Sequence, residues 1–306
     1  MSSSNVPTAN KPKFSVAISQ PNYQKLINNT LGDPNRARRF VAAISSAVAV
    51  NPALQECTAG SILSGALLGE SLNLSPSPQL GQYYLVPFKS KAKINKATGE
   101  VLEDECSKAT FVLGYKGYIQ LALRSGYYAD LDSIEIKQGE YLGKDSSTGK
   151  PKFQFIEDDD AREQLETVGY MAYFEYLNGF KKLMYWSKEK MLSHADKYSP
   201  AFSKASYEKI QNKEIADKDM WKYSSFWYKS FDDMAKKTML RQLISHWGIM
   251  SIEMQTAFEK DNTIVMQKDN GEFVSDIPKI SSPSESSPEI IPDSIDSIPK
   301  VDLNSL

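Results

Sequence analysis

The segment from Ala109 to Gly126 constrains the fold more than any other part of the chain. An apolar run, Ala109–Leu113, leads directly into Gly114, and Gly126 closes the stretch that follows. This order predicts a strand, a glycine turn and a short helix with a glycine at its C-terminal cap. At about 100° per residue, one face of that helix is apolar. That face holds Tyr115, Tyr118, Ile119, Ala122 and Leu123.

The opposite face of this predicted helix is polar and basic. Lys116, Gln120 and Arg124 follow one another at intervals of four residues, with Gly117 beside them. Two positive charges and an amide suit a polyanion such as a nucleic-acid strand, and the N–H groups that open a helix also favour anions. Gly117 would let a backbone approach closely. An ordinary amphipathic helix with a solvated basic face has the same pattern, so both interpretations stay open.

Composition places the chain among folded globular proteins. Of its 306 residues, 41% are hydrophobic and 11% aromatic, which is enough for one large domain or two ordinary ones. No apolar run approaches the roughly 20 residues of a membrane helix, and the first residues lack the pattern of a signal peptide. Only two cysteines and two histidines occur, and no histidine neighbours a cysteine. We therefore expect a cytoplasmic protein without a disulfide framework, metal or cofactor.

Charge is divided unevenly between the body of the chain and its end. The net charge is −2, but residues 281–306 hold five acids and one base. The remaining part carries 35 bases and 33 acids. Because that part is only mildly basic, a site for nucleic acid would have to be a local groove rather than a whole basic face.

Three of the six arginines lie together near the start of a predicted helix. Asp33-Pro34 is typical of a helix N-terminus, and residues 36–50 continue with an apolar stripe. Arg36, Arg38 and Arg39 therefore stand at the positive end of a helix dipole, which is unfavourable for cations. A phosphate or carboxylate partner would relieve this repulsion. Solvent or acidic neighbours would do the same.

Strand patterns dominate the middle of the chain. The expected strands cover residues 82–88, 109–113, 130–137, 152–156, 166–176 and 180–186. Asn178-Gly179 joins the last two and is a strong signal for an antiparallel hairpin. Residues 89–107 predict an exposed, mobile hairpin whose basic arm includes Lys89 and Lys91. That arm could contact DNA, although such excursions are usually solvated surface.

Aromatic residues alternate with lysines over residues 196–229. They are Tyr198, Phe202, Tyr207, Trp221, Tyr223, Phe226, Trp227 and Tyr228. Such rings can stack on nucleic-acid bases, with about 1–3 kcal/mol gained for each base. They can equally fill a hydrophobic core or a subunit interface. For this segment we favour the core or interface role.

A long helix is predicted from Phe231 to Trp247, where Gly248 ends it. Two pairs with i,i+4 spacing are expected near its start, Asp232 with Lys236 and Asp233 with Lys237. Lys237 and Arg241 form a stripe at the edge of the apolar face. Lys236 projects into that face, where it needs a partner, a functional site or a snorkelling side chain.

The chain therefore divides into three expected parts. Residues 1–33 form a flexible N-terminal segment with a short helix in the region 15–31, and residues 34–260 form the folded core. Residues 251–260 supply the last helix of that core. Residues 261–306, rich in Ser, Pro and acids, form a flexible tail.

Signatures of covalent catalysis are weak. Gly143–Pro151 superficially resembles a phosphate-binding loop, but its spacing is wrong and Pro stands where Ser or Thr is needed. Residues 157–160 are four adjacent acids, which would point in different directions on a loop, whereas catalytic metal sites gather ligands from separate elements. ATP hydrolysis and metal-dependent cleavage are therefore unsupported.

Several segments together carry a resemblance to a known family. They are Leu72–Pro78, Gly81–Phe88, Gly114–Gly126, Trp227 with Asp233–Arg241, and Ile252–Met254. In this order the chain resembles the RecT family of phage-encoded single-strand annealing recombinases. The resemblance implies an α+β fold, with a small antiparallel sheet and packed helices, related to other single-strand annealing proteins. It also implies ATP-independent pairing of complementary strands in the cytoplasm of a bacterial host.

The resemblance further implies partners and a basic groove. The partners would be single-stranded and annealed duplex DNA, further copies of the chain in a ring or helical filament, an exonuclease and the host's single-strand-binding protein. By position, the groove would draw on Lys116, Arg124, Lys236, Lys237 and Arg241. Tyr115, Gln120, Lys89 and Lys91 complete the candidate DNA-contacting set.

Two other classes of function stay open. One is an oligomeric phage assembly protein without DNA activity, in which the aromatic residues make subunit contacts. The other is a nuclease that uses acids such as Glu70, Asp130 and Asp132. Annealing itself needs little covalent chemistry, because phosphate contacts position a strand and leave the base edges free to pair.

Overall fold

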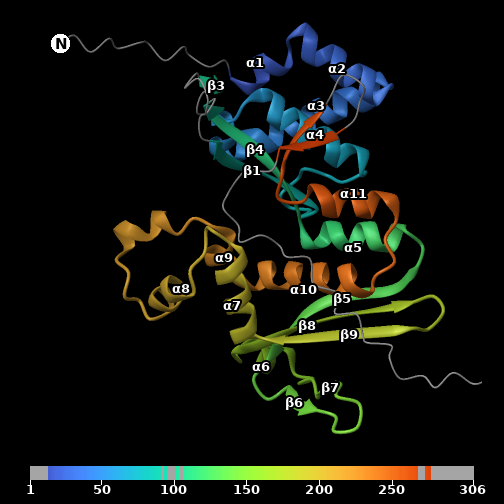
Figure 1. The fold of residues 1–306 in the computed structure, drawn as a ribbon, viewed down its shortest axis with the longest axis vertical. Coiled ribbons are helices and arrows are strands. Elements are labelled where there is room, and N and C mark those ends of the chain that lie inside the picture. Colours follow the sequence, from blue (N-terminus) through green and yellow to red (C-terminus); the bar gives the residue numbers. More distant parts are fainter. Residues whose placement is uncertain (1–12, 91–92, 95–100, 104–105, 268–272, 277–306) are drawn as a thin grey trace, which may run out of the picture.

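A computed structural model describes residues 13–90, 93–94, 101–103, 106–267 and 273–276. Figure 1 shows an α+β architecture, as predicted, with the N-terminal helices at one end and a three-stranded antiparallel sheet toward the other. The α5, α10 and α11 helices lie between these two parts (Figure 1). In the described residues, no helix is both long enough and apolar enough to span a bilayer.

The N-terminal part consists of helices that pack on a two-stranded sheet. They are α1 (Phe14–Ile18), α2 (Pro21–Leu31), α3 (Pro34–Val50), the short 3-10 helix η1 (Pro52–Glu56) and α4 (Ala59–Ser71). The predicted start of α3 is confirmed, since the Asp33 carboxylate accepts a hydrogen bond of 2.8 Å from the Asn35 N–H. Thr58 precedes α4, and its hydroxyl bonds the Ser61 hydroxyl instead of capping the backbone.

Two antiparallel pairs of strands follow α4. The first joins β1 (Tyr83–Ser90) to β4 (Cys106–Leu113), and the second joins β2 (Lys93–Ile94) to β3 (Val101–Glu103). Lys91 and much of the hairpin expected over residues 89–107 lie outside the described residues. The helix predicted after Gly114 is confirmed as α5 (Tyr115–Arg124), and Gly126 has the left-handed φ of +77° that the cap requires.

The largest sheet has the strand order β5-β8-β9 and is antiparallel throughout. Its strands are β5 (Tyr128–Lys137), β8 (Thr167–Tyr176) and β9 (Lys181–Ser187). Asn178-Gly179 forms the predicted turn, with a φ of +83° at Gly179. A small excursion between β5 and β8 contains β6 (Tyr141–Lys144), which the sequence analysis did not predict, β7 (Pro151–Phe153) and α6 (Asp159–Glu163).

The C-terminal part covers the sheet and returns to the N-terminal part. Its elements are α7 (Lys188–Tyr198), α8 (Lys204–Gln211), the 3-10 helix η2 (Asp217–Lys222), α9 (Phe226–Lys229), α10 (Phe231–Trp247), α11 (Ile252–Lys260), β10 (Ile264–Gln267) and β11 (Phe273–Asp276). The α10 helix has the predicted bounds and packs along all three strands of the sheet. The β10 strand packs on α4 and β4, so the ordered fold continues past the boundary expected at residue 260.

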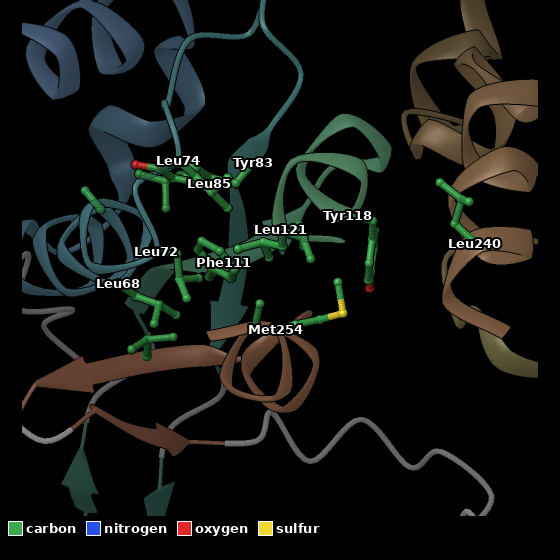
Figure 2. Packing of buried hydrophobic residues seen from close by; sticks show 14 of the residues in the cluster. Leu68, Leu72, Leu74, Tyr83, Leu85, Phe111, Tyr118, Leu121, Leu240 and Met254 are labelled. Carbon is green, nitrogen blue, oxygen red and sulfur yellow. The ribbon is translucent and has the colours of Figure 1, made fainter. Parts of the chain in front are cut away.

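One hydrophobic core runs through both parts. Figure 2 shows Leu68 and Leu72 of the α4 region beside Phe111 of β4, with Leu121 of α5 and Met254 of α11 completing the same cluster. Part of the aromatic segment 196–229 also belongs to this core. Phe202, Tyr207 and Trp227 are buried around Phe231, the first residue of α10. For these three residues, the interpretation as core side chains is the correct one.

Candidate nucleic-acid interface

The α5 helix presents different faces from those that its sequence pattern predicts. Leu121 is buried, whereas Leu123, which was expected on the apolar face, is 44% exposed. The helix packs against α10, α11 and β5, so its buried surface is set by these neighbours rather than by a single stripe. Lys116 and Gln120 are exposed, as predicted.

Gly117 does allow a close backbone approach, but the backbone belongs to the same chain. A Cβ atom added at Gly117 would overlap the carbonyl oxygen of Gln82, which precedes β1. The same oxygen accepts a hydrogen bond of 2.8 Å from the Gly114 N–H. The expectation that Gly117 admits a nucleic-acid backbone is therefore wrong. Its role is to seat α5 on the segment 72–82 that links α4 to β1, which we call the connector.

Arg124 is exposed but already engaged with the connector. Its guanidinium donates to the carbonyl oxygens of Leu72 at 2.8 Å and Asn73 at 3.3 Å. These carbonyls follow the last turn of α4, where a cation is favoured by the helix dipole. Arg124 therefore fixes the connector to the C-terminal end of α5.

A cleft of about 330 Å³ opens at the other end of α5. We call it the α5–α10 cleft, because it lies where the first turns of these two helices meet the connector. Its walls are Pro78, Gln79, Gly81 and Tyr84; Val112 through Lys116; and Phe226, Ser230, Asp233, Met234 and Lys237. The rings of Tyr84 and Phe226 lie 5.9 Å apart, and Phe226 is 46% exposed. Lys116 has no hydrogen-bond or ion-pair partner among the described residues.

Two of the expected groove cations converge on one buried carboxylate. Asp261, at the end of α11, is fully buried and lies 3.2 Å from Lys237 Nζ and 2.8 Å from an Arg241 terminal nitrogen. It also accepts hydrogen bonds from the Tyr118 hydroxyl and the Leu113 N–H, both at 2.9 Å. The expected Asp233–Lys237 pair is therefore wrong, because the Lys237 side chain points into this cluster instead of along the helix surface.

Burial governs the ionisation of this cluster. Burial lowers the pKa of the Lys237 ammonium, although the Asp261 carboxylate opposes that shift. Burial also raises the pKa of the Tyr118 hydroxyl, and the nearby carboxylate raises it further. The four groups form a polar centre that ties β4, α5 and α10 to the end of α11. Lys237 both lines the cleft and belongs to this centre.

Lys236 has two carboxylate partners rather than a snorkelling side chain. Its ammonium lies 3.2 Å from Asp233 and 3.4 Å from Glu135 of β5, and 5.6 Å from the centre of the Tyr115 ring. The expected Asp232–Lys236 pair is wrong, since Asp232 instead accepts a hydrogen bond of 2.5 Å from the Tyr170 hydroxyl. Lys236 thus contacts the Tyr115 ring, which lines the cleft.

The chain is similar to known proteins of one family. The chain matches the RecT family over residues 38–275, which is more than half of its length. It belongs to the RecT family. An uncharacterised protein of Bacillus subtilis, YqaK, is 33% identical over 267 residues, which cover 85% of this chain and 78% of YqaK. The protein RecT of Escherichia coli is 23% identical over 249 residues, which cover 80% of this chain and 78% of that protein.

In this RecT-family chain, the structure gathers some of the candidate residues and separates others. Tyr115, Lys116 and Lys237 line the α5–α10 cleft, and Lys236 and Arg241 support it from one side. Gln120 lies one helical turn beyond Lys116. Lys89 is exposed near the end of β1, opposite Ser107 of β4.

Two parts of this candidate site were not evident from the sequence. Tyr84 was placed in a strand without a role, and Asp261 was assigned to the tail. A signal existed for Phe226, which belongs to the aromatic segment that was considered for base stacking. Asp261 had no local signal, because its partners lie 20 to 148 residues away along the chain.

The acids considered for a nuclease site engage neighbouring groups. Glu70 pairs with Arg36 at 2.7 Å, and Asp130 accepts a hydrogen bond of 3.0 Å from the Tyr173 hydroxyl. Asp132 accepts one of 2.7 Å from the Ser133 N–H. Over the described part of the chain, no three histidine, cysteine or acidic side chains gather as a metal site would require.

Proposed function

We propose that this RecT-family protein binds single-stranded DNA in the α5–α10 cleft and pairs it with a complementary strand, without ATP hydrolysis or covalent catalysis. Family membership supports a role in recombination by single-strand annealing. The observation that carries the site assignment is the exposed Lys116 beside the rings of Tyr84, Tyr115 and Phe226.

The chemistry of the cleft suits binding of a strand without recognition of its base sequence. Lys116 offers a positive charge to a phosphate, and phosphate contacts fix a strand's position without carrying sequence information. The aromatic rings offer faces on which bases of any sequence can stack, at about 1–3 kcal/mol for each base. The Watson–Crick edges of a strand held in this way would stay available to a second strand.

The candidate residues take different roles in this proposal. Lys116 and Tyr115 contact the strand directly, whereas Lys237 lines the cleft with its ammonium paired to the buried Asp261 and acts as a positioning residue. Lys236 and Arg241 act as positioning residues, because their partners are Glu135, Asp233 and Asp261. Gln120, Arg124 and Lys89 would meet DNA only where the strand extends beyond the cleft, and Lys91, which lies outside the described residues, is kept as a candidate on its sequence alone.

Further parts of the proposal rest on family membership alone. We infer that residues 34–260, extended by β10, form the annealing core, and that the chain assembles with copies of itself into a ring or filament. We further infer a prophage or phage origin, action in the bacterial cytoplasm, and cooperation with an exonuclease and with the host's single-strand-binding protein.

The decisive experiment compares Lys116→Glu with a matched charge reversal elsewhere. Lys144→Glu is a suitable control, since Lys144 is exposed on β6, which lies far from α5 (Figure 1), and has no ion-pair partner among the described residues. Two complementary dye-labelled oligonucleotides are mixed without ATP, and pairing is followed by energy transfer. We expect the wild-type protein and Lys144→Glu to accelerate pairing, and the rate of pairing with Lys116→Glu to be at least tenfold lower.

Each result has a distinct meaning. If Lys116→Glu still accelerates pairing, the protein anneals DNA but does not bind the strand through this cleft. A folded, oligomeric wild-type protein that neither binds nor pairs DNA would contradict the proposal and favour the phage assembly protein. Binding should also weaken as salt rises, because counterions are released when phosphates are neutralised.

A further inference from the structure

A second cleft, of about 440 Å³, opens on the other side of the connector. We call it the α3 cleft, because Arg36 and Arg39 from the first turns of α3 form one wall. The connector forms the opposite wall with Asn73, Pro76 and Gln82. The arginine cluster that the sequence analysis singled out therefore faces a cavity, and the α5–α10 cleft does not use it.

The three arginines of that cluster have separate environments. Arg36 is held by Glu70, with its Nε 2.7 Å from a carboxylate oxygen. Arg38 donates a hydrogen bond of 2.9 Å to the Asn35 side chain and does not line the cleft. Arg39 lines the cleft, is exposed, and has no acceptor among the described residues. With Glu70 neutralised by Arg36, the cleft keeps the unopposed charge of Arg39.

The connector adds hydrogen-bond donors to this charge. The side-chain oxygen of Gln82 accepts a bond of 2.7 Å from the Ser75 N–H, which leaves the amide nitrogen of Gln82 as a donor without an acceptor in the described part of the chain. The side chain of Asn73 is exposed at a residue with a φ of +51°. Phe40 and Pro76 supply apolar surface beside these groups. A guanidinium, amide donors and an apolar wall together suit a phosphate with its attached nucleoside.

The two clefts share one structural element. Asn73, Pro76 and Gln82 line the α3 cleft, whereas Pro78, Gln79 and Gly81 line the α5–α10 cleft. The Gln82 carbonyl is bonded to Gly114 and the Asn73 carbonyl to Arg124, so the connector is fixed to both ends of α5. A strand that leaves one cleft across the connector would enter the other.

We propose that the α3 cleft is a second contact for the same DNA strand, with Arg39 as the phosphate ligand and Arg36 positioned beside it by Glu70. This inference rests on the proposed function, since it assigns a further part of the strand's path. It extends the DNA surface from α5 to the N-terminal helices α1 to α4, none of which carries one of the nine candidate residues.

The test compares Arg39→Ala with Arg38→Ala in the full-length chain. The two variants remove the same charge from adjacent residues of α3, but only Arg39 lines the cleft. Binding of fluorescent oligo(dT) of increasing length is measured by anisotropy over a range of salt concentrations. We expect Arg39→Ala to weaken binding of the longer oligonucleotides several-fold and to lower the salt slope by about 0.7, as for one lost phosphate contact on a single strand. Arg38→Ala should match the wild type.

The outcomes separate this inference from the proposed function. If the wild type binds, Lys116→Glu does not, and Arg39→Ala equals Arg38→Ala at every length, then the α3 cleft is not on the strand's path. A wild type that binds no oligonucleotide would overturn both proposals. If Arg39→Ala loses only binding of free dTMP, a mononucleotide and not a strand occupies the cleft, which also contradicts the inference. Circular dichroism checks that each variant is folded.

Discussion

At the scale of the residue, the Asp261 carboxylate is the centre of the polar cluster that joins β4, α5, α10 and the end of α11. Its side chain is fully buried and meets two cations, a tyrosine hydroxyl and a backbone N–H. A buried carboxylate is tolerated only when such partners replace its lost hydration. Because the Lys237 side chain is also buried, with 8% exposed, each of these two charges depends on the other.

Asp261→Asn should therefore be strongly destabilising. The amide leaves the buried Lys237 ammonium without a counterion, which costs about 3 kcal/mol of unfolding free energy. Asp233→Asn is the control, because Asp233 also pairs with a lysine of α10 but its side chain is 65% exposed, and such pairs contribute less than about 1 kcal/mol. The midpoint of urea unfolding measures both. Equal midpoints for the two variants would show that the cluster does not stabilise the fold.

At the scale of the element, the seat of α5 on the connector depends on Gly117. Alanine usually stabilises a helix by about 1 kcal/mol relative to glycine. At this position, however, the new methyl group would overlap the Gln82 carbonyl oxygen, which is backbone and cannot rotate away. The clash should exceed the gain in helix propensity.

Gly117→Ala should lower the unfolding free energy by about 1–3 kcal/mol, the usual cost of overpacking. It should also weaken DNA binding, because both clefts border the connector. Gly60→Ala in α4 is the control, since its methyl group would lie 3.7 Å from the Tyr23 hydroxyl, an ordinary contact. That variant should be neutral or slightly stabilised in thermal unfolding. If Gly117→Ala were instead more stable than the wild type, the connector would have to shift to accommodate the methyl group.

The elements that the sequence predicted well are those with local signals at both ends. Asp33-Pro34 marks the start of α3, and Gly126 and Gly248 mark the ends of α5 and α10. The buried and exposed faces were less predictable, because α5 is covered by three other elements rather than one. The cluster at Asp261 could not be predicted from the sequence, because the spacing of residues along the chain does not indicate which distant lysine lies next to a buried acid.

At the scale of the whole molecule, charge separates the folded body from the end of the chain. Residues 281–306 hold five acids and one base, while the rest of the chain has a small excess of bases. Lys116 and Arg39 are exposed cations on the body. Acids that are tethered to the same chain compete with phosphates for such cations, and the competition is screened over about 8 Å at physiological salt.

A chain that ends at residue 280 should therefore bind oligo(dT) several-fold more tightly than the full-length protein at low salt. The difference should shrink as salt is raised, because screening weakens the tail's charge along with that of the DNA. Anisotropy titrations at several salt concentrations measure both effects. A full-length variant with the five acids changed to their amides is the matched control, since it removes the charge and keeps the length. If the shortened chain binds more tightly but the amide variant does not, the tail hinders DNA by occupying space, and charge is not the cause.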